Sequence, residues 1–242
     1  MGCSIGVENC IYAGTIGPFV RLGADVGFIT CAHVVGFLNK TVVQPADGDS
    51  YETGRACGTV LDVQFDPGKP VDAALIKVNN RDVAPTDFTW LNPNEVLNAG
   101  FDLTKPPSFL GGSVRMITDF SEVQGKRVIK CGKATGLTKG SLALNGTMIK
   151  IEDCYLPFPE GITWNELNGV VMKNQYQVEN NRYPFSTFGD SGAGVYLVEN
   201  EHNNLSLIGI NIGLLNNYSI VTPIGFVLES LRLQPEDVIA DN

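Results

Sequence analysis

A serine surrounded by glycines is the part of this sequence that most clearly suggests chemistry. Ser191 is flanked by Gly189, Asp190, Gly192 and Gly194, and an apolar run follows. Glycines on both sides of a hydroxyl let the backbone turn tightly and bring bare N–H groups close to a bound carbonyl. An oxyanion hole requires such amides. The alternative is a glycine-rich turn between two strands, and this segment alone does not decide between them.

A histidine and an aspartate stand where such a serine could use them. His33 ends an apolar run, and Asp72 opens another, where a carboxylate is costly unless it is hydrogen-bonded or paired. A serine hydroxyl becomes a nucleophile when an adjacent base takes its proton. An imidazole base needs a fixed tautomer and support for its positive charge, which a carboxylate provides. A core histidine and a capped turn are the alternatives for these two positions.

Three motifs in this order resemble those of chymotrypsin-like serine proteases. Thr30-Cys-Ala-His33 is similar to the family's Thr-Ala-Ala-His, and Asp72-Ala-Ala-Leu75 to its Asp-Ile-Ala-Leu. Phe188-Gly-Asp-Ser-Gly-Ala193 is similar to its Gly-Asp-Ser-Gly-Gly. Residues 207–210 resemble the following strand, which lines the substrate cleft, and the terminal helix matches as well. The resemblance therefore covers nearly the whole chain.

The resemblance implies an all-β fold of two antiparallel β-barrels with a C-terminal helix. It places His33 and Asp72 in an N-terminal barrel, residues 1–110, and Ser191 in a C-terminal barrel, residues 111–242. The implied activity is that of a serine endopeptidase, which cleaves polypeptide substrates through an acyl-enzyme without a cofactor or metal. The amides of Gly189 and Ser191 would form the oxyanion hole.

The sequence departs from the secreted members of the family in two respects. Their catalytic histidine is followed by a disulfide-bonded cysteine, where this chain has Val34. In those members a freshly cut Ile or Val amino terminus also pairs with the aspartate before the nucleophile. If Met1 is the first residue, Asp190 needs another partner. The chain thus resembles the disulfide-poor intracellular, bacterial or viral branches.

An ungapped count from the serine places the specificity pocket. Phe185, followed by Ser186, stands where trypsin-like enzymes carry an aspartate. Asn211 takes the place of a histidine in Glu-cleaving and some viral relatives, and Asn216 is a further candidate for the pocket lining. We therefore predict that the side chain before the scissile bond is small or medium-sized, and apolar or neutral-polar.

Two rival interpretations remain open at this stage. One is a catalytically silent module that keeps the fold for binding or regulation, which Phe185 and an unpaired Asp190 would favour. The other is a protease domain that a larger multidomain protein holds inactive.

Composition excludes several other classes of protein. The 242 residues carry a formal net charge of −9, and such a surface repels the phosphates of nucleic acids. No apolar run reaches the roughly 20 residues that cross a bilayer. The N-terminus lacks the features of a secretory signal, so we expect a cytoplasmic protein without membrane contact. With six irregularly spaced cysteines and only two histidines, reduced thiols are favoured over disulfides or zinc.

Short β-like runs recur along the chain, separated by Gly, Pro, Asn and Asp, as in an all-β barrel or sandwich. One helix is expected at about residues 222–233, because Thr222 and Pro223 suit its start and apolar residues recur at helical spacing. Residues 79–112 have little alternation and are interpreted as the crossover between two β units. Residues 157–168 are expected to form a long surface loop.

Overall fold

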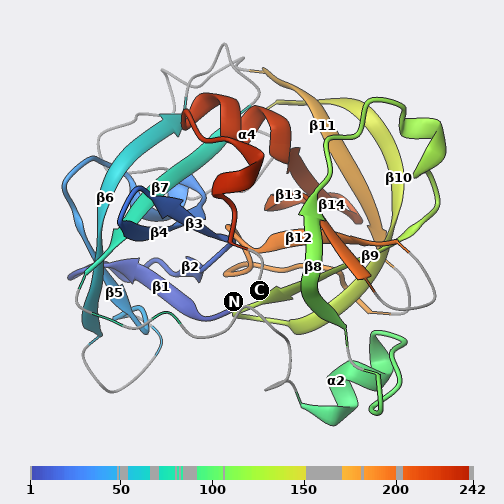
Figure 1. The fold of residues 1–242 in the computed structure, drawn as a ribbon, viewed down its shortest axis with the longest axis horizontal. Coiled ribbons are helices and arrows are strands. Elements are labelled where there is room, and N and C mark those ends of the chain that lie inside the picture. Colours follow the sequence, from blue (N-terminus) through green and yellow to red (C-terminus); the bar gives the residue numbers. More distant parts are fainter. Residues whose placement is uncertain are drawn as a thin grey trace.

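The computed structural model describes most of the chain as two curled β-sheets with few helices (Figure 1). The residues described are 2–47, 49, 54–65, 71–79, 81, 83, 92–105, 107–150, 171–180, 183–199 and 204–239. The expected surface loop at residues 157–168 lies outside these residues. This architecture confirms the all-β prediction with a C-terminal helix.

The first sheet has seven strands in the order β2-β1-β5-β6-β7-β4-β3, all paired antiparallel. Its strands are β1 (Ser4–Val7), β2 (Gly14–Thr15), β3 (Phe19–Leu22), β4 (Asp25–Thr30), β5 (Thr41–Gln44), β6 (Arg55–Phe65) and β7 (Asp72–Val78). The inner strands β4 and β7 are almost continuously buried. Helix α1 (Ala32–Val35) follows β4 at once, so this buried strand fixes where the helix begins.

The second sheet has the order β12-β9-β10-β11-β14-β13-β8. Its strands are β8 (Ser108–Val114), β9 (Arg127–Gly132), β10 (Gly136–Lys150), β11 (Val171–Asn180), β12 (Gly194–Val198), β13 (Asn204–Leu215) and β14 (Tyr218–Pro223). An additional pairing of β12 with β13 closes six of these strands into a barrel. Strand β8 pairs with β13 in parallel, outside that ring. The division of the chain at about residue 110 stays a prediction, although β8, which spans it, belongs to the second sheet.

Four short helices complete the described part of the fold beside α1. They are α2 (Pro93–Asn98), the 3₁₀ helix η1 (Phe120–Glu122), α4 (Ile224–Ser230) and the 3₁₀ helix η3 (Pro235–Asp237). The expected C-terminal helix is confirmed as α4, which packs on β13 and β14. No helix in the described ranges is long and apolar enough to span a membrane.

Helix α2 was not predicted, because the crossover was interpreted as irregular. The local signal for it is a polar cap followed by proline. Asn92 accepts a hydrogen bond from the Asn94 amide at 2.9 Å, and Pro93 occupies the first turn.

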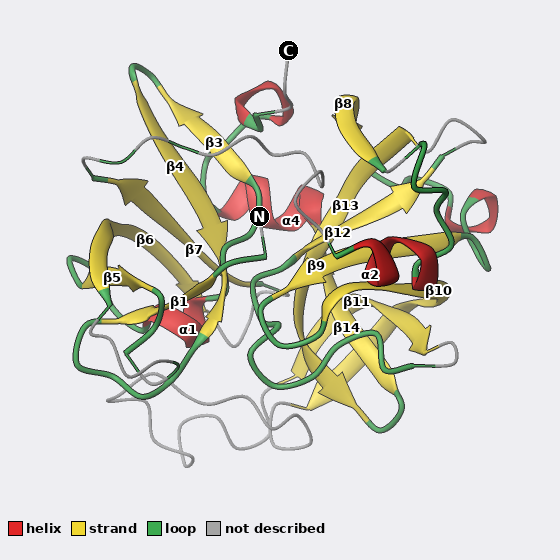
Figure 2. Ribbon diagram, turned by 90° about the horizontal axis from the view of Figure 1, so that it is seen from below, coloured by secondary structure: helices red, strands yellow, loops and turns green. Residues whose placement is uncertain are grey.

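The two sheets lie side by side, as Figure 2 shows, and buried side chains of both form one large cluster. A second, smaller cluster fills the C-terminal barrel. The loop between β11 and β12 carries Ser191 and contacts the first sheet, since Thr15 N–H of β2 donates to the Ser191 carbonyl at 2.8 Å.

Candidate active site

His33 and Asp72 form a buried, hydrogen-bonded pair. Strand β4 pairs with β7 in a register that sets Thr30 opposite Ala74, so α1 begins beside the start of β7. His33 Nδ1 is hydrogen-bonded to Asp72 Oδ2, and the His33 backbone N–H donates to Asp72 Oδ1 at 3.1 Å. Both side chains are 0% exposed. A carboxylate at Nδ1 favours the tautomer with its proton there, which leaves Nε2 as an acceptor.

The other nitrogen of this imidazole has no partner in the described residues. His33 Nε2 is buried and makes no hydrogen bond. Ser191 Oγ donates to the carbonyl of Ile212 at 3.5 Å. No hydrogen bond joins His33 to Ser191 in this structure. Catalytic hydrogen bonds are often long or poorly aligned in a protein without substrate and tighten only when substrate binds.

Ser191 lies in a tight loop that only glycine can form at two positions. Gly189 and Gly192 have φ of 97° and 94°, in the left-handed region that side chains disfavour. A Cβ atom on Gly192 would also lie 2.2 Å from Thr30 Oγ1 and 2.5 Å from the Thr15 carbonyl oxygen. The glycines therefore allow the serine loop to pack in close contact with the first barrel.

Two backbone amides of this loop have no hydrogen-bond acceptor among the described residues. Among the hydrogen bonds of the described residues, neither Gly189 N–H nor Ser191 N–H donates one. The neighbouring amides are used, since Asp190 N–H donates to Thr187 O at 3.1 Å and Gly192 N–H to Asn211 O at 2.8 Å. Unpaired amides on either side of Asp190 are what a negatively charged oxygen requires.

The first barrel holds the serine loop directly. Thr15 N–H donates to the Ser191 carbonyl at 2.8 Å, and Thr15 Oγ1 donates to the Gly189 carbonyl at 2.8 Å. Cys31 Sγ donates to the Asn211 carbonyl at 3.3 Å, the same oxygen that accepts from Gly192. These contacts join the element that bears His33 to the loop that bears Ser191.

Asp190 has a partner that the sequence analysis did not identify. Lys130 Nζ lies 3.1 Å from Asp190 Oδ2, and both side chains are 0% exposed. From the sequence alone, Lys130 looks like an ordinary strand charge. The available signal was its place between Ile129 and Cys131 in an apolar strand, together with an aspartate in need of a cation.

The four expected pocket residues have different environments. Phe185 is 0% exposed, and its ring belongs to the core of the second barrel. Ser186 is buried, and its hydroxyl lies 2.7 Å from that of Ser219. Asn211 is fully buried, donates from Nδ2 to Asp190 O at 3.2 Å and leaves Oδ1 without a partner. Asn216 is exposed in the turn between β13 and β14.

One cluster of possible metal ligands lies at the same place. Ligand atoms of Cys31, His33 and Asp72 lie within 4.8 Å of one another. Burial, followed by the nearby Asp72 charge, raises the pKa of the Cys31 thiol well above its usual value. A metal needs the thiolate, so this donor set is poorly suited to one.

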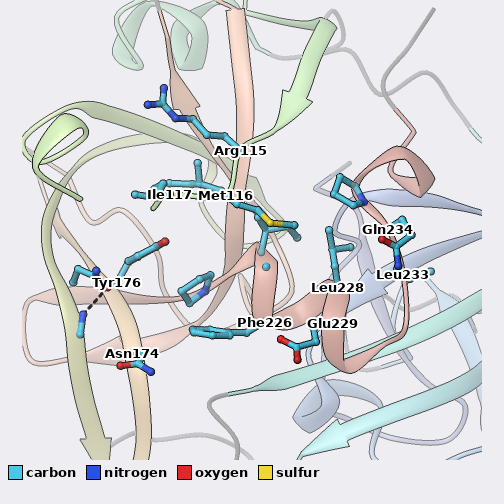
Figure 3. Close-up of a pocket in the computed structure, with 17 residues that line it drawn as sticks. Arg115, Met116, Ile117, Asn174, Tyr176, Phe226, Leu228, Glu229, Leu233 and Gln234 are labelled. Atoms are coloured by element: carbon cyan, nitrogen blue, oxygen red, sulfur yellow. Dashed lines mark hydrogen bonds between the residues drawn. The ribbon is translucent and has the colours of Figure 1, made fainter. Parts of the chain in front are cut away.

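A separate cavity of about 560 Å³ lies beside α4 (Figure 3). Met116, Phe226 and Leu228 give it an apolar lining, with Arg115 and Glu229 as its charged residues. None of its lining residues belongs to the site described above.

Comparison with solved structures identifies the fold. Protease A of Thermobifida fusca is 17% identical, with a TM-score of 0.60 over 99% of this chain and 97% of that chain. A chymotrypsin of Cellulomonas bogoriensis is 17% identical, with a TM-score of 0.58 over 99% and 97%. A Nocardiopsis protease is 15% identical, with a TM-score of 0.58 over 96% and 95%.

The chain therefore has the chymotrypsin-like fold, and the structures to which it is similar are serine proteases. No family model matches the sequence, and no curated protein does so either.

Proposed function

We propose that this protein is a serine endopeptidase that uses His33, Asp72 and Ser191. One observation supports it most: next to the hydrogen-bonded imidazole–carboxylate pair, the Cys31 thiol binds the Asn211 carbonyl that also accepts from Gly192, in the loop that bears the serine. In this proposal His33 Nε2 is the base, and it forms a hydrogen bond with the Ser191 hydroxyl when substrate binds.

The proposed reaction has two stages. Ser191 Oγ attacks the scissile carbonyl while His33 Nε2 takes its proton, and the imidazolium then gives that proton to the leaving amine. Water, deprotonated by the same nitrogen, then attacks the resulting ester, and the imidazolium returns that proton to Ser191 Oγ as the acid leaves. Asp72 stabilises the imidazolium through Nδ1 in both stages.

The oxyanion of each tetrahedral intermediate would lie against the Gly189 and Ser191 amides. Loss of one such donor in another serine protease lowers turnover about 10²- to 10³-fold, roughly 2.7–4 kcal/mol. Because these amides are already unpaired, binding the oxyanion breaks no existing hydrogen bond in the described chain.

A fluorophosphonate probe tests this proposal. We expect the purified wild-type protein to be labelled at Ser191. The Ser191→Ala variant should not be labelled, although its thermal unfolding midpoint should equal that of the wild type. Ser206→Ala is a matched control, since it removes a buried hydroxyl of the same barrel outside the proposed site. A folded protein that is never labelled would exclude the enzyme.

That outcome would favour a second candidate, a catalytically silent module for binding or regulation. Its support is the absence of a hydrogen bond between the two described residues His33 and Ser191. The fold and the buried pair would then serve recognition of a polypeptide.

We further propose a neutral specificity pocket. The polar groups at the predicted positions are the Asn211 carboxamide and the Ser186 hydroxyl, with Ser219 beside it, and none of them is charged. Phe185 would close the pocket from the core side, because its ring is fully buried.

In a peptide library, small or medium-sized neutral side chains before the cleaved bond should be preferred over Arg and Lys by at least about tenfold, or 1.4 kcal/mol. Asn211→Val removes the unpaired acceptor, so the preference for neutral-polar over apolar side chains should fall. A library result dominated by Arg or Lys would contradict the proposed pocket.

The proposed enzyme would work in a reducing compartment of the cell. All five described cysteines, Cys3, Cys10, Cys31, Cys57 and Cys131, are free thiols.

A further inference from the structure

A second cavity, of about 680 Å³, is lined by helix α2, by the start of β10 and by the chain segment that leads to the serine loop. We propose that this cavity binds a small organic anion, whose carboxylate pairs with Lys139 and whose apolar body packs against Leu97 and Leu137. The proposal goes beyond the endopeptidase function and does not depend on it.

The cavity has the size and the lining of a small-molecule site. Such sites measure about 300–1,000 Å³ and combine apolar walls with a few polar groups. Leu137 and Ala99 are buried, whereas Leu97 and Tyr183 are 53% and 56% exposed. An apolar ligand would therefore cover side chains that now contact water, which favours binding.

Lys139 is a cation without a counter-ion. Within the described part of the chain its ammonium group makes no hydrogen bond and no ion pair. The acidic residue among those that line the cavity is Glu95 of α2, and its Oε2 already accepts from Leu137 N–H at 3.1 Å. A Cβ atom on Gly136 would lie 2.6 Å from the same oxygen, so this carboxylate packs against the backbone at the start of β10.

A second cation lies beside the first. Arg127 of β9 is close to Lys139 in the paired strand β10. A Cβ atom on Gly100 would lie 3.1 Å from Arg127 Nη1 and 3.3 Å from Lys139 Nζ, so both groups approach the same point. Neither has a carboxylate partner in the described residues, although the chain carries a formal net charge of −9. Like charges at this separation repel, and an anion beside Lys139 would offset the repulsion.

The end of helix α2 accounts for Arg127 but not for Lys139. Arg127 Nη1 donates to the Gly100 carbonyl at 2.9 Å, just after the helix, and its guanidinium lies 4.6 Å from the centroid of the Phe101 ring. A cation at a helix C-terminus is stabilising, and Arg127 supplies it. The charge of Lys139 is therefore left for a ligand in the cavity that it lines.

The cavity also contacts the segment that precedes the serine loop. Pro184 and Thr187 line it, and between them the Phe185 carbonyl accepts from Thr138 Oγ1 at 2.6 Å. A bound ligand would thus touch α2, β10 and residues 183–187 at once. Because a ligand stabilises the conformation that it binds, these three segments should open less often when the site is filled.

The test uses 2-naphthoate, an aromatic carboxylate, and its uncharged analogue 2-naphthamide, with binding measured by titration calorimetry. We expect the wild-type protein to bind 2-naphthoate at least about tenfold more tightly than 2-naphthamide, since a hydrogen bond to a charged group is worth more than a neutral one. This comparison needs no variant.

Three variants assign the contacts. Lys139→Met should weaken the binding of 2-naphthoate at least about tenfold and leave that of 2-naphthamide within about twofold, whereas Lys139→Arg should keep both affinities. Lys126→Met is the matched control, because it removes an exposed cation next to the same strand pair that does not line the cavity. Leu97→Ala should weaken both ligands about threefold, since it shortens the apolar wall.

Hydrogen exchange locates the site without any measurement of activity. With 2-naphthoate bound, the backbone amides of residues 94–99, 135–139 and 183–187 should exchange more slowly. Residues 224–229, which adjoin the other cavity, should keep their rate. If the fluorophosphonate does not label the wild type, the proposed function fails while the calorimetry and the exchange still decide the anion site.

Three results would overturn the proposal. The first is a wild-type protein that binds neither ligand or binds both equally. The second is a Lys139→Met protein with wild-type affinity for 2-naphthoate. The third is slower exchange at residues 224–229 alone, which would place the ligand beside α4.

Discussion

Replacing Ser191 or His33 with alanine is expected to lower kcat by about 10⁶-fold, with nearly the same loss in each variant. The two residues act as a unit, since the hydroxyl is a poor nucleophile without the base and the base has no other nucleophile to activate. Ser191→Ala/His33→Ala should then lose little more than either single variant. Steady-state hydrolysis of a peptide found in the library screen measures all three.

The controls separate chemistry from folding. Ser191 is partly buried, and its hydroxyl makes a single, long hydrogen bond within the described part of the chain, so Ser191→Ala should unfold at nearly the wild-type temperature. His33→Ala leaves Asp72 buried without its imidazole and should be less stable. If the losses in activation free energy of the two single variants added in the double variant, the two residues would not share one mechanism.

Asp72→Asn is expected to lower kcat about 10⁴-fold while the protein stays folded. The carboxamide preserves the shape of the side chain but can present an N–H to His33 Nδ1. The imidazole then favours the tautomer with its proton on Nε2, which cannot accept a proton from Ser191. The pH dependence of kcat together with thermal unfolding distinguishes this effect from loss of the fold.

A loss of less than about tenfold in Asp72→Asn would show that another carboxylate supports the base. The sequence offers Asp62 and Asp66 as the alternatives. Asp62 is half-buried on β6, where it accepts from Gln64 Nε2 at 2.8 Å, and Asp66 lies outside the described residues. Asp62→Asn would then be the next variant to measure, and under the present proposal it should keep wild-type kcat.

The sequence could predict the fold because the features that define it are short segments that follow one another in a fixed order along the chain. Apolar runs of strand length, with turn residues between them, indicate an all-β chain, and the three motifs indicate which barrels it forms. The contact between His33 and Asp72 was also predictable, since each residue adjoins a buried strand and a carboxylate there needs a partner.

Long-range partners were harder to foresee. The pairing of Lys130 with Asp190 joins residues 60 positions apart in sequence number, and no short pattern records it. The pocket depends on side-chain direction, which an ungapped count does not give. That count places Phe185 at the pocket floor, and its ring is fully buried in the core of the second barrel, so the assignment of the pocket residues stays a prediction.

Thr15 has a consequence for engineering this chain. Its amide and hydroxyl both bind carbonyls of the serine loop, and its own carbonyl accepts from Thr30 Oγ1 at 3.0 Å. The shape of the loop in one barrel is thus partly determined by a threonine in the other. The second barrel produced alone would lack the two Thr15 hydrogen bonds that hold the serine loop. A graft of the serine segment onto another β-barrel would therefore also need a threonine in the equivalent position of its partner barrel.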